Sequence, residues 1–371
     1  MSDSPPVIAD LHCDTVMLMR QGYDISVRNA TGHIDIPRMR QAGVNLQCFA
    51  CFVDSELPAG KRAAEVDDKI DTLESACKKH TDQIAICRTE AEAREIIDSG
   101  RIAAFIAIEN GMALEDDLAK LEHFYSRGVR YMTLIHGVTS EWCVSDADKE
   151  PPFDGLTEFG LEVVRRMNEL GMMIDVSHVH PLAIDKILAN TRAPIIASHS
   201  ACKALCGHHR NLSDEHIKGI ASADGIIGMV YHGDFISDKR RRITEAYIAA
   251  DPEMYKDASY FYFGKYTGKE REEKERTLGP YLAEWERRVW PVNPGIREVI
   301  DHIDYIVRLV GPDYVGFGSD FDGMFLPPNG LEDISRTADI IKGLSEQGYT
   351  EDYVRLIQGE NFMRVFREVC K

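Results

Sequence analysis

Eight short β-type runs, separated by stretches with helical periodicity, constrain the fold of this chain more than any other feature. Each run is rich in Ile, Val, Phe or small residues and is bounded by Gly, Pro or charged residues. Most are apolar throughout, as is typical of strands buried on both faces of a parallel sheet. They span residues 7–14, 44–53, 102–109, 129–136, 172–178, 193–199, 225–231 and 314–320.

Apolar residues at helical spacing occupy five of the gaps, at residues 114–127, 155–170, 181–190, 213–223 and 294–310. Gly128, Gly171 and Gly311 precede the next strand, where helices commonly end. Strands alternating with helices in this way predict an α/β fold of the (β/α)8 TIM barrel type, as a single domain over residues 1–371. Two further helical stretches, 331–347 and 351–369, are expected to pack outside the barrel.

A segment from about residue 233 to residue 292 follows the seventh strand and is far longer than an ordinary βα loop. It contains the basic cluster 239–242 and the charge-dense run 269–276. Such runs are typical of solvated helix faces. Because the segment leaves the C-terminal end of a strand, it is also a candidate wall or lid of the active site.

Composition narrows the partners and the compartment. The formal net charge of -18 argues against nucleic acid or an anionic membrane as a partner. No run approaches the roughly 18 apolar residues of a membrane helix, and the N-terminal residues lack the features of a signal peptide. The nine cysteines are spread through apolar segments, which favours reduced thiols and a cytoplasmic location.

Imidazole and carboxylate side chains stand at or near the ends of six predicted strands. In a barrel these positions meet at the C-terminal mouth, where barrel enzymes carry their active sites. An isolated histidine in an apolar segment is more commonly a core residue than a ligand, but a set spread over six strands is hard to obtain by chance. The set comprises His12, Asp14, Glu109, His136, His178, His199 and Asp320.

The chemistry of this set favours a metal site. His12 and Asp14 are two residues apart on one strand and therefore share a face, while Cys13 faces the other way. Three histidines with an aspartate and a glutamate suit zinc or a similar ion. Five ligands exceed the needs of one tetrahedral catalytic zinc, so two ions about 3.5–4 Å apart that share a carboxylate fit better. His136 and Asp320 then remain for acid/base and oxyanion roles.

The cysteine motifs compete poorly as metal sites. Cys48 and Cys51 form a CxxC motif, but their odd spacing on a strand places the thiols on opposite faces. Cys202 and Cys206 lie at helical spacing near two histidines, and no further ligand pair is close in sequence. We expect these two thiols to pack a helix against the barrel.

Eight segments in order along the chain resemble the membrane (renal) dipeptidase family, peptidase family M19 of the amidohydrolase superfamily. They are DLHCDT at 10–15, IDIPRMRQAGVNLQCF at 34–49, IAIENG at 106–111, GVRYMTLIH at 128–136, MMIDVSHVHP at 172–181, APIIASHSACKAL at 193–205, HRNLSDE at 209–215 and VGFGSDFDG at 315–323.

The resemblance implies a role for each residue of the predicted site. His12 and Asp14 would bind the first zinc, His178 and His199 the second, and Glu109 would bridge both, with a hydroxide between the ions as the nucleophile.

Three further roles concern the substrate. Asp320 resembles the acid/base of the family, and Asp322, two residues further on, is the alternative. His136 resembles the residue that polarises the scissile carbonyl, and Arg210 resembles the arginine that holds the C-terminal carboxylate of the substrate.

The sequence therefore predicts a dinuclear zinc dipeptidase that acts on small dipeptides with a free C-terminal carboxylate. The resemblance also suggests a homodimer. Two alternatives stay open at this point: an amidase for N-acyl amino acids or lactam-type amides on the same barrel, and a metal-holding barrel without catalytic turnover. A panel of dipeptides beside N-acyl amino acids separates the first alternative from the dipeptidase.

Overall fold

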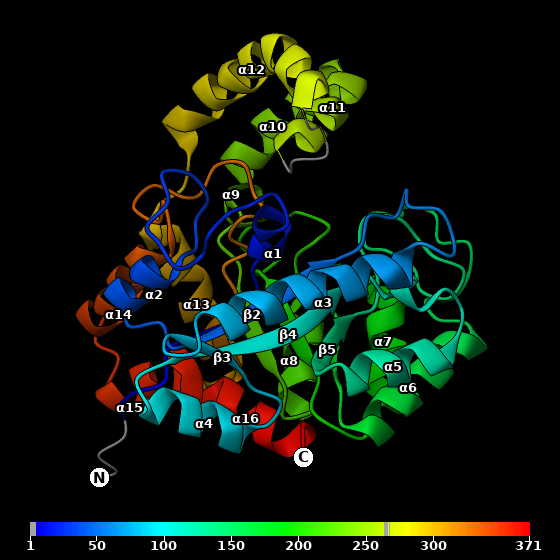
Figure 1. Cartoon of the computed structure of the whole chain (residues 1–371), viewed down its shortest axis with the longest axis vertical. Coiled ribbons are helices and arrows are strands. Elements are labelled where there is room, and N and C mark those ends of the chain that lie inside the picture. The colour runs from blue at the N-terminus through cyan, green and yellow to red at the C-terminus, as the bar shows by residue number, and fades with distance from the viewer. Residues whose placement is uncertain (1–4, 263–265, 267) are drawn as a thin grey trace.

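A closed barrel of eight parallel strands forms the body of the protein in the computed structural model, which describes residues 5–262, 266 and 268–371 (Figure 1). The strands follow the order β1-β2-β4-β5-β6-β7-β8-β9, and β9 pairs with β1 to close the barrel. A short additional strand, β3, pairs with the beginning of β4. The strands are β1 Ala9–Asp10, β2 Leu46–Phe52, β3 Ile84–Ile86, β4 Ile102–Glu109, β5 Val129–Thr133, β6 Met173–Asp175, β7 Ile196–Ser200, β8 Ile226–Met229 and β9 Val315–Phe317.

Helices surround the barrel, which confirms the predicted (β/α)8 class. The helices are α1 Thr15–Met19, α2 Ile36–Ala42, α3 Arg62–Lys79, α4 Glu90–Asp98, α5 Leu118–Ser126, α6 Glu158–Leu170, α7 Pro181–Asn190, α8 Asp214–Ser222, α9 Gly233–Ile236, α10 Asp238–Ala250, α11 Pro252–Tyr262, α12 Gly268–Val289, α13 Ile296–Val310, α14 Thr337–Glu346, α15 Glu351–Arg355 and α16 Asn361–Val369. Their sharp boundaries have local causes. The side chain of Asp35 accepts a hydrogen bond from the Arg38 backbone at the start of α2, and Gly43 ends that helix with φ 75°.

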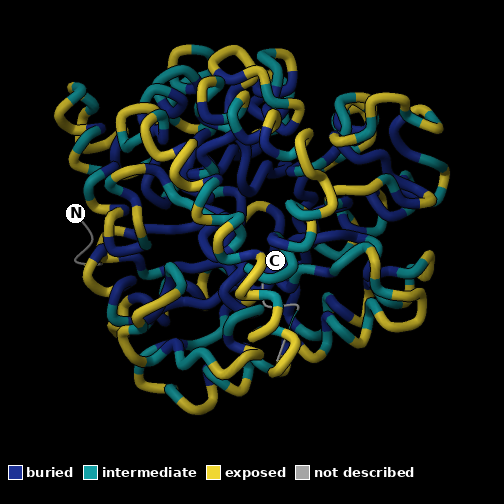
Figure 2. Tube along the Cα trace, turned by 90° about the horizontal axis from the view of Figure 1, so that it is seen from above, coloured by how far each residue is buried: buried dark blue, intermediate teal, exposed yellow. Residues whose placement is uncertain are grey.

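Two apolar layers hold the barrel together. The inner layer fills the barrel with side chains such as Leu11, Phe105 and Tyr131, and the outer layer joins the strands to the helices. Figure 2 shows the result as buried segments in the middle of the molecule with exposed segments around them. Cys48 belongs to the inner layer and Cys51 to the outer layer, as their odd spacing on β2 predicts.

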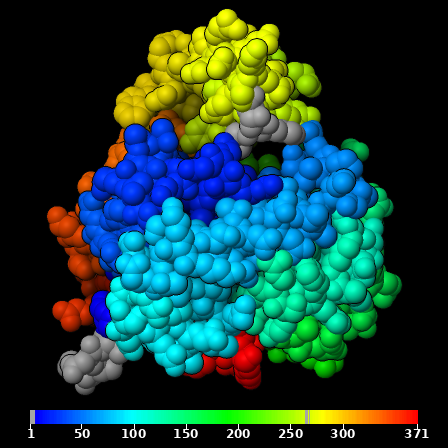
Figure 3. Space-filling view, in the orientation of Figure 1, coloured from blue at the N-terminus to red at the C-terminus, as the bar shows by residue number. Residues whose placement is uncertain are grey.

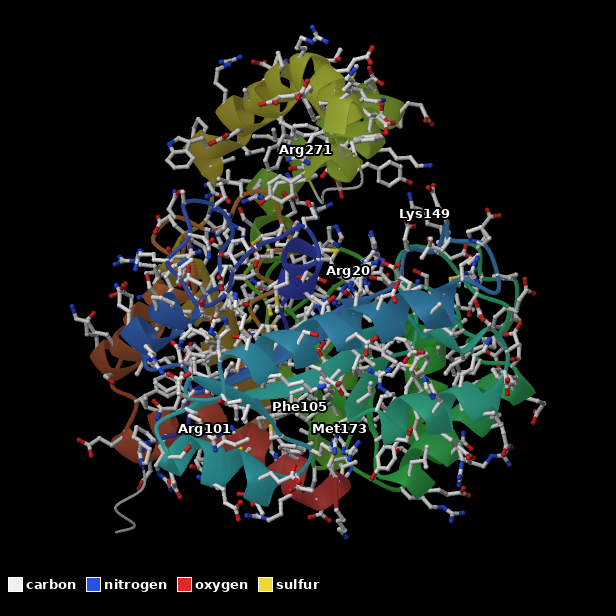
Figure 4. All side chains as sticks on the ribbon, viewed as in Figure 1. Arg20, Arg101, Phe105, Lys149, Met173 and Arg271 are labelled. Atoms are coloured by element: carbon white, nitrogen blue, oxygen red, sulfur yellow. The ribbon has the colours of Figure 1, made fainter. Side chains whose placement is uncertain are left out.

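Helix α16 closes the N-terminal end of the barrel rather than packing on its side. The ring of Phe366 lies 4.9 Å from that of Phe105, and Phe362 lies 5.6 Å from the same ring. Phe105 and Met173 lie at this lower end of the body, near α16 (Figure 4). The stacked contact between Phe105 and Tyr131, at 5.8 Å, continues this packing toward the opposite end of the barrel.

The long segment after β8 forms α9 to α12, and α10 to α12 make a lobe above the C-terminal ends of the strands (Figures 1 and 3). Most of its charged residues are exposed, in line with the prediction of solvated helix faces. Arg240, within the basic cluster 239–242, and Asp234 are buried instead. The Arg240 side chain donates hydrogen bonds to Asp234, to Asn293 and to the backbone carbonyl of Leu326.

Candidate active site

The predicted ligands converge at the C-terminal mouth of the barrel, and Glu109 lies at their centre. Its Oε2 is 3.4 Å from Nε2 of His12, while its Oε1 is 3.3 Å from Nε2 of His178 and 3.6 Å from Nε2 of His199. Asp14 Oδ2 lies 3.7 Å from Nε2 of His12. The two oxygens of one carboxylate therefore face two different groups of nitrogen atoms.

Side-chain atoms of these residues form three overlapping clusters in which every pair of potential ligand atoms is within 4.8 Å. The clusters are His12, Asp14 and Glu109; Glu109, His136 and His178; and His12, His199 and Asp320. Nε2 of His12 and Oδ1 of Asp14 are buried and have no hydrogen-bond partner among the described residues. Buried polar atoms are normally paired, so this donor set fits divalent cations.

Hydrogen bonds behind the histidines set the orientation of their rings. Tyr131 donates its hydroxyl proton to the carbonyl of Leu11, so its oxygen accepts from Nδ1 of His12 at 2.9 Å. Ser198 likewise donates to Asp175 at 2.6 Å and accepts from Nδ1 of His199 at 2.7 Å. With the proton on Nδ1, the lone pair on Nε2 of each ring points into the cluster, as metal ligation requires.

Negative charge accumulates in the cluster. Burial and the nearby Glu109 raise the pKa of Asp14, and burial and Asp14 raise the pKa of Asp320 well above its usual range. Burial and the positive charge of Arg210 lower the pKa of His178 to about 3, so this ring is neutral at pH 7. Burial opposes protonation of His12, but Glu109 and Asp14 raise its pKa well above its usual range. Buried carboxyl groups that attract protons in this way form an electrostatic environment that cations stabilise.

Backbone conformation marks the same region. Asn110, His178, Asp320 and Asp322 all have positive φ angles, between 63° and 86°, which residues other than glycine rarely adopt. Gly323 lies against the carboxylates of Asp14 and Asp320, and a Cβ atom there would overlap both. Such unfavourable conformations tend to cluster at functional sites.

A cavity of about 470 Å³ opens above the cluster. Asp14, Glu109, His136, His178 and Asp320 line its floor. The remaining wall includes Phe52 at the end of β2, Asp54, Ser55 and Glu56 from the loop after it, His232 immediately before α9 and Phe235 within it, and Ser259 and Tyr260 from α11. The segment after β8 thus contributes to the cavity.

His136 lines the cavity, whereas Arg210 is not among the described residues that line it. His136 is about one-third exposed, with Nε2 4.0 Å from Oε1 of Glu109 and its ring 4.8 Å from Phe52. The guanidinium of Arg210 is buried beside the cluster, where it donates to the carbonyl of His199 at 2.6 Å and to Ser200 Oγ at 2.8 Å. Its Nε has no partner among the described residues.

Asp322 has a different environment from Asp320. Its Oδ2 accepts from the Thr15 hydroxyl at 2.6 Å, and its Oδ1 accepts from the backbone of His33 at 2.7 Å. Asp320 lines the cavity, and Asp322 is not among the residues that do. The geometry therefore favours Asp320 over Asp322 for a role in proton transfer.

His232 lines the cavity and was not among the predicted site residues. It follows β8, its ring stacks on Phe235 at 4.1 Å, and burial lowers its pKa to about 4. Its position after the seventh barrel strand is the signal that could have identified it, because the other site residues also follow strands.

The chain matches the model of one known protein family over nearly its whole length. A model described as membrane dipeptidase, peptidase family M19, matches residues 3–371. The chain belongs to this family. It is therefore a metallopeptidase of the dipeptidase type, a hydrolase acting on peptide bonds, which confirms the family predicted from its sequence motifs.

Three solved structures share the fold over nearly the whole chain. The probable dipeptidase PvdM from Pseudomonas aeruginosa is 24% identical, with a TM-score of 0.82, and covers 98% of this chain and 95% of its own. Dipeptidase AC, a metallopeptidase of family M19, is 24% identical, with a TM-score of 0.78 and coverage of 98% and 99%.

The third, a metallopeptidase from Rhodobacter sphaeroides, is 22% identical, with a TM-score of 0.79 and coverage of 99% and 100%. It was solved with a phosphinate mimic of the dipeptide L-Ala-D-Ala.

The structure also bears on the predicted reduced cysteines and on the predicted lack of a membrane helix. All nine cysteines are buried free thiols. Among the described residues, no helix combines the length and the apolar character needed to span a bilayer.

Proposed function

We propose that this M19 metallopeptidase is a dinuclear zinc dipeptidase that hydrolyses small dipeptides with a free C-terminal carboxylate. The observation that carries the proposal is the position of Glu109, whose two oxygens face His12 on one side and His178 with His199 on the other. One bridging carboxylate with terminal ligands on both sides is the arrangement expected of a two-metal site.

The proposed ligands are His12 and Asp14 for one ion, His178 and His199 for the other, and Glu109 for both. When bound, the two ions would supply Lewis-acid activation of the carbonyl and a water molecule that deprotonates near neutral pH. Tyr131 and Ser198 hold the His12 and His199 rings with Nε2 facing the cluster, where the ions would bind.

The remaining residues would position the substrate and move the proton. Asp320 takes a proton from the attacking water and delivers it to the leaving amine nitrogen as the C–N bond breaks. His136 Nε2 donates a hydrogen bond to the carbonyl oxygen as negative charge develops on it. Arg210, with an unpartnered Nε beside the cluster, binds the C-terminal carboxylate.

The dipeptide mimic bound by the structural relative from Rhodobacter sphaeroides supports a dipeptide as the substrate class. The experiment is hydrolysis by the zinc-loaded enzyme of a panel of dipeptides beside N-acyl amino acids. We expect kcat/KM to be highest for dipeptides. Faster hydrolysis of N-acyl amino acids would replace this proposal with the amidase alternative. The cytoplasmic location and the homodimer stay predictions.

A further inference from the structure

The order of the barrel strands places the segment after β7, which carries Arg210, opposite the loop after β2 at the barrel mouth. In the closed barrel, β2 and β7 are four strands apart in either direction. Arg210 lies in the segment between β7 and α8 and donates to the carbonyl of His199 in β7. If Arg210 holds the C-terminal carboxylate, as proposed above, the N-terminal residue of the dipeptide extends toward β2.

We propose that the β2–α3 loop and helix α11 together form the pocket for the side chain of the N-terminal residue of the substrate, and that this pocket favours apolar side chains. This inference rests on the proposed function and adds a specificity-determining surface to it. From the loop side the cavity is lined by Phe52, Asp54 and Glu56, and from α11 by Ser259 and Tyr260.

An ion pair joins the two halves of this pocket. Nζ of Lys256, in α11, lies 2.6 Å from Oε1 of Glu56 in the β2–α3 loop. The same ammonium group lies 5.6 Å from the centre of the Tyr260 ring. Figure 3 shows a hollow beneath the lobe, between it and the light-blue segment that contains this loop. Lys256 thus connects the lobe to the barrel at the cavity wall.

Buried contacts at the base of the lobe make it a fixed wall. Arg240 donates to Asp234 Oδ1 at 3.1 Å and to the carbonyl of Leu326 at 2.8 Å, and its guanidinium lies 5.4 Å from the Trp285 ring. Phe325, five residues after Asp320, packs edge-on against Trp285 at 5.7 Å. The loop that carries Asp320 and the lobe therefore share one packed cluster.

The chemistry of the pocket predicts its preference. The Phe52 and Tyr260 rings offer apolar surface to an aliphatic or aromatic side chain. The charged groups at the wall are already paired: Glu56 with Lys256 at 2.6 Å, and Lys69, which also lines the cavity, with Glu65 at 3.1 Å and with the carbonyl of Phe52.

The test measures kcat and KM of the zinc-loaded enzyme on two dipeptide series. One series varies the N-terminal residue (Gly-Gly, Leu-Gly, Phe-Gly, Glu-Gly), and the other varies the C-terminal residue (Gly-Leu, Gly-Phe). For Tyr260→Ala we expect kcat/KM on Leu-Gly and Phe-Gly to fall roughly tenfold, because an apolar contact of this kind discriminates by that order. Gly-Leu and Gly-Phe should change less than about twofold.

Lys256→Ala tests the ion pair. We expect KM for Phe-Gly to rise severalfold with kcat nearly unchanged, and the charge-swapped double variant Glu56→Lys, Lys256→Glu to recover the KM of the wild type. Arg287→Ala is the matched control, since it removes an ion pair within α12, Arg287 with Glu284, and should leave both series unchanged.

Equal changes in the two series, or unchanged selectivity in both Tyr260→Ala and Lys256→Ala, would overturn the assignment of the pocket. A wild-type enzyme that prefers Glu-Gly over Leu-Gly would do the same. Failure of the proposed function looks different, because the wild-type enzyme with zinc bound would then hydrolyse none of these dipeptides.

Discussion

Oε2 of Glu109 lies 3.4 Å from Nε2 of His12, and this contact uses only one of the two oxygens of the carboxylate. The other oxygen faces His178 at 3.3 Å. Glu109→Gln keeps the shape of the side chain but replaces one of these oxygens with an amide nitrogen, which cannot ligate. We expect metal content to fall below two per chain and kcat/KM to drop by more than roughly 100-fold, since even indirect supports of metal ligands are worth 10- to 100-fold.

Metal analysis and steady-state kinetics on the same preparation check this prediction. Glu141→Gln is the control, because Glu141 is exposed and outside the cluster. Two bound ions and wild-type activity in Glu109→Gln would show that this carboxylate does not bridge.

Asp320 and Asp322 provide a pair of variants that separates proton transfer from structure. Asp320 lines the cavity, while the carboxylate of Asp322 accepts hydrogen bonds from Thr15 and His33. Asp320→Asn should lower kcat by about 10²–10⁴-fold, the usual contribution of general acid–base catalysis, with metal content near two per chain. Asp322→Asn should lower the free energy of unfolding while kcat stays within a few-fold of wild type. The reverse pattern would assign the acid/base to Asp322.

Arg210 should contribute to KM through the free carboxylate of the substrate. A hydrogen bond to a charged group is worth about 1.5–3 kcal/mol, so Arg210→Lys, which loses the planar fork, should raise KM for a dipeptide roughly 10- to 100-fold. A dipeptide amide lacks the carboxylate, so the wild-type enzyme should bind it weakly and the variant should bind it about equally. If Arg210→Lys weakens the binding of the dipeptide amide and of the free dipeptide to the same extent, Arg210 has another role.

Sequence patterns located the barrel and the side chains that meet at its mouth because both depend on local signals. Each of the eight barrel strands was recognised from its apolar run, and the residues proposed as ligands from their places at strand ends. Strand β4 has the predicted bounds, and the other barrel strands are shorter than predicted. Residues 7–14, for example, contain β1 of only Ala9–Asp10, because the pairing beyond Asp10 becomes irregular: Cys13 forms an isolated bridge with Phe321, and the Asp14 backbone donates to the carbonyl of Phe321.

Features fixed by distant contacts were harder to predict. Arg240 belongs to a basic run that is typical of a solvated helix, yet partners far away in sequence, Asn293 and Leu326, bury it. Strand β3 and helices α3 and α4 were not identified, although Val66, Ile70, Leu73 and Cys77 of α3 follow helical spacing. The contribution of Ser259 and Tyr260 to the cavity depends on how the lobe folds back over the barrel.

His302 predicts a pH dependence of stability that is separate from catalysis. Burial lowers its pKa to about 4, and its ring accepts from the Cys202 backbone at Nδ1 and faces the carbonyl of Ile236 at Nε2. The unfolded chain binds this proton near pH 6.5, so the free energy of unfolding falls as the pH decreases from about 6.5 to about 4. Over that window the contribution is about 3 kcal/mol.

His302→Gln preserves the hydrogen bonds but does not titrate. Denaturant unfolding at pH 7 and pH 4 should show the variant gaining stability relative to the wild type by about this amount at the lower pH. A difference between the two proteins that stays constant across this range would contradict the assignment.

The most direct test of the two-metal account is recovery of dipeptidase activity as zinc is added back to chelator-stripped enzyme. With Glu109 between two groups of ligands, we predict that hydrolysis of a dipeptide is negligible without metal and reaches its maximum at two zinc ions per chain. Full activity at one ion per chain, or activity that never appears at two, would contradict the account.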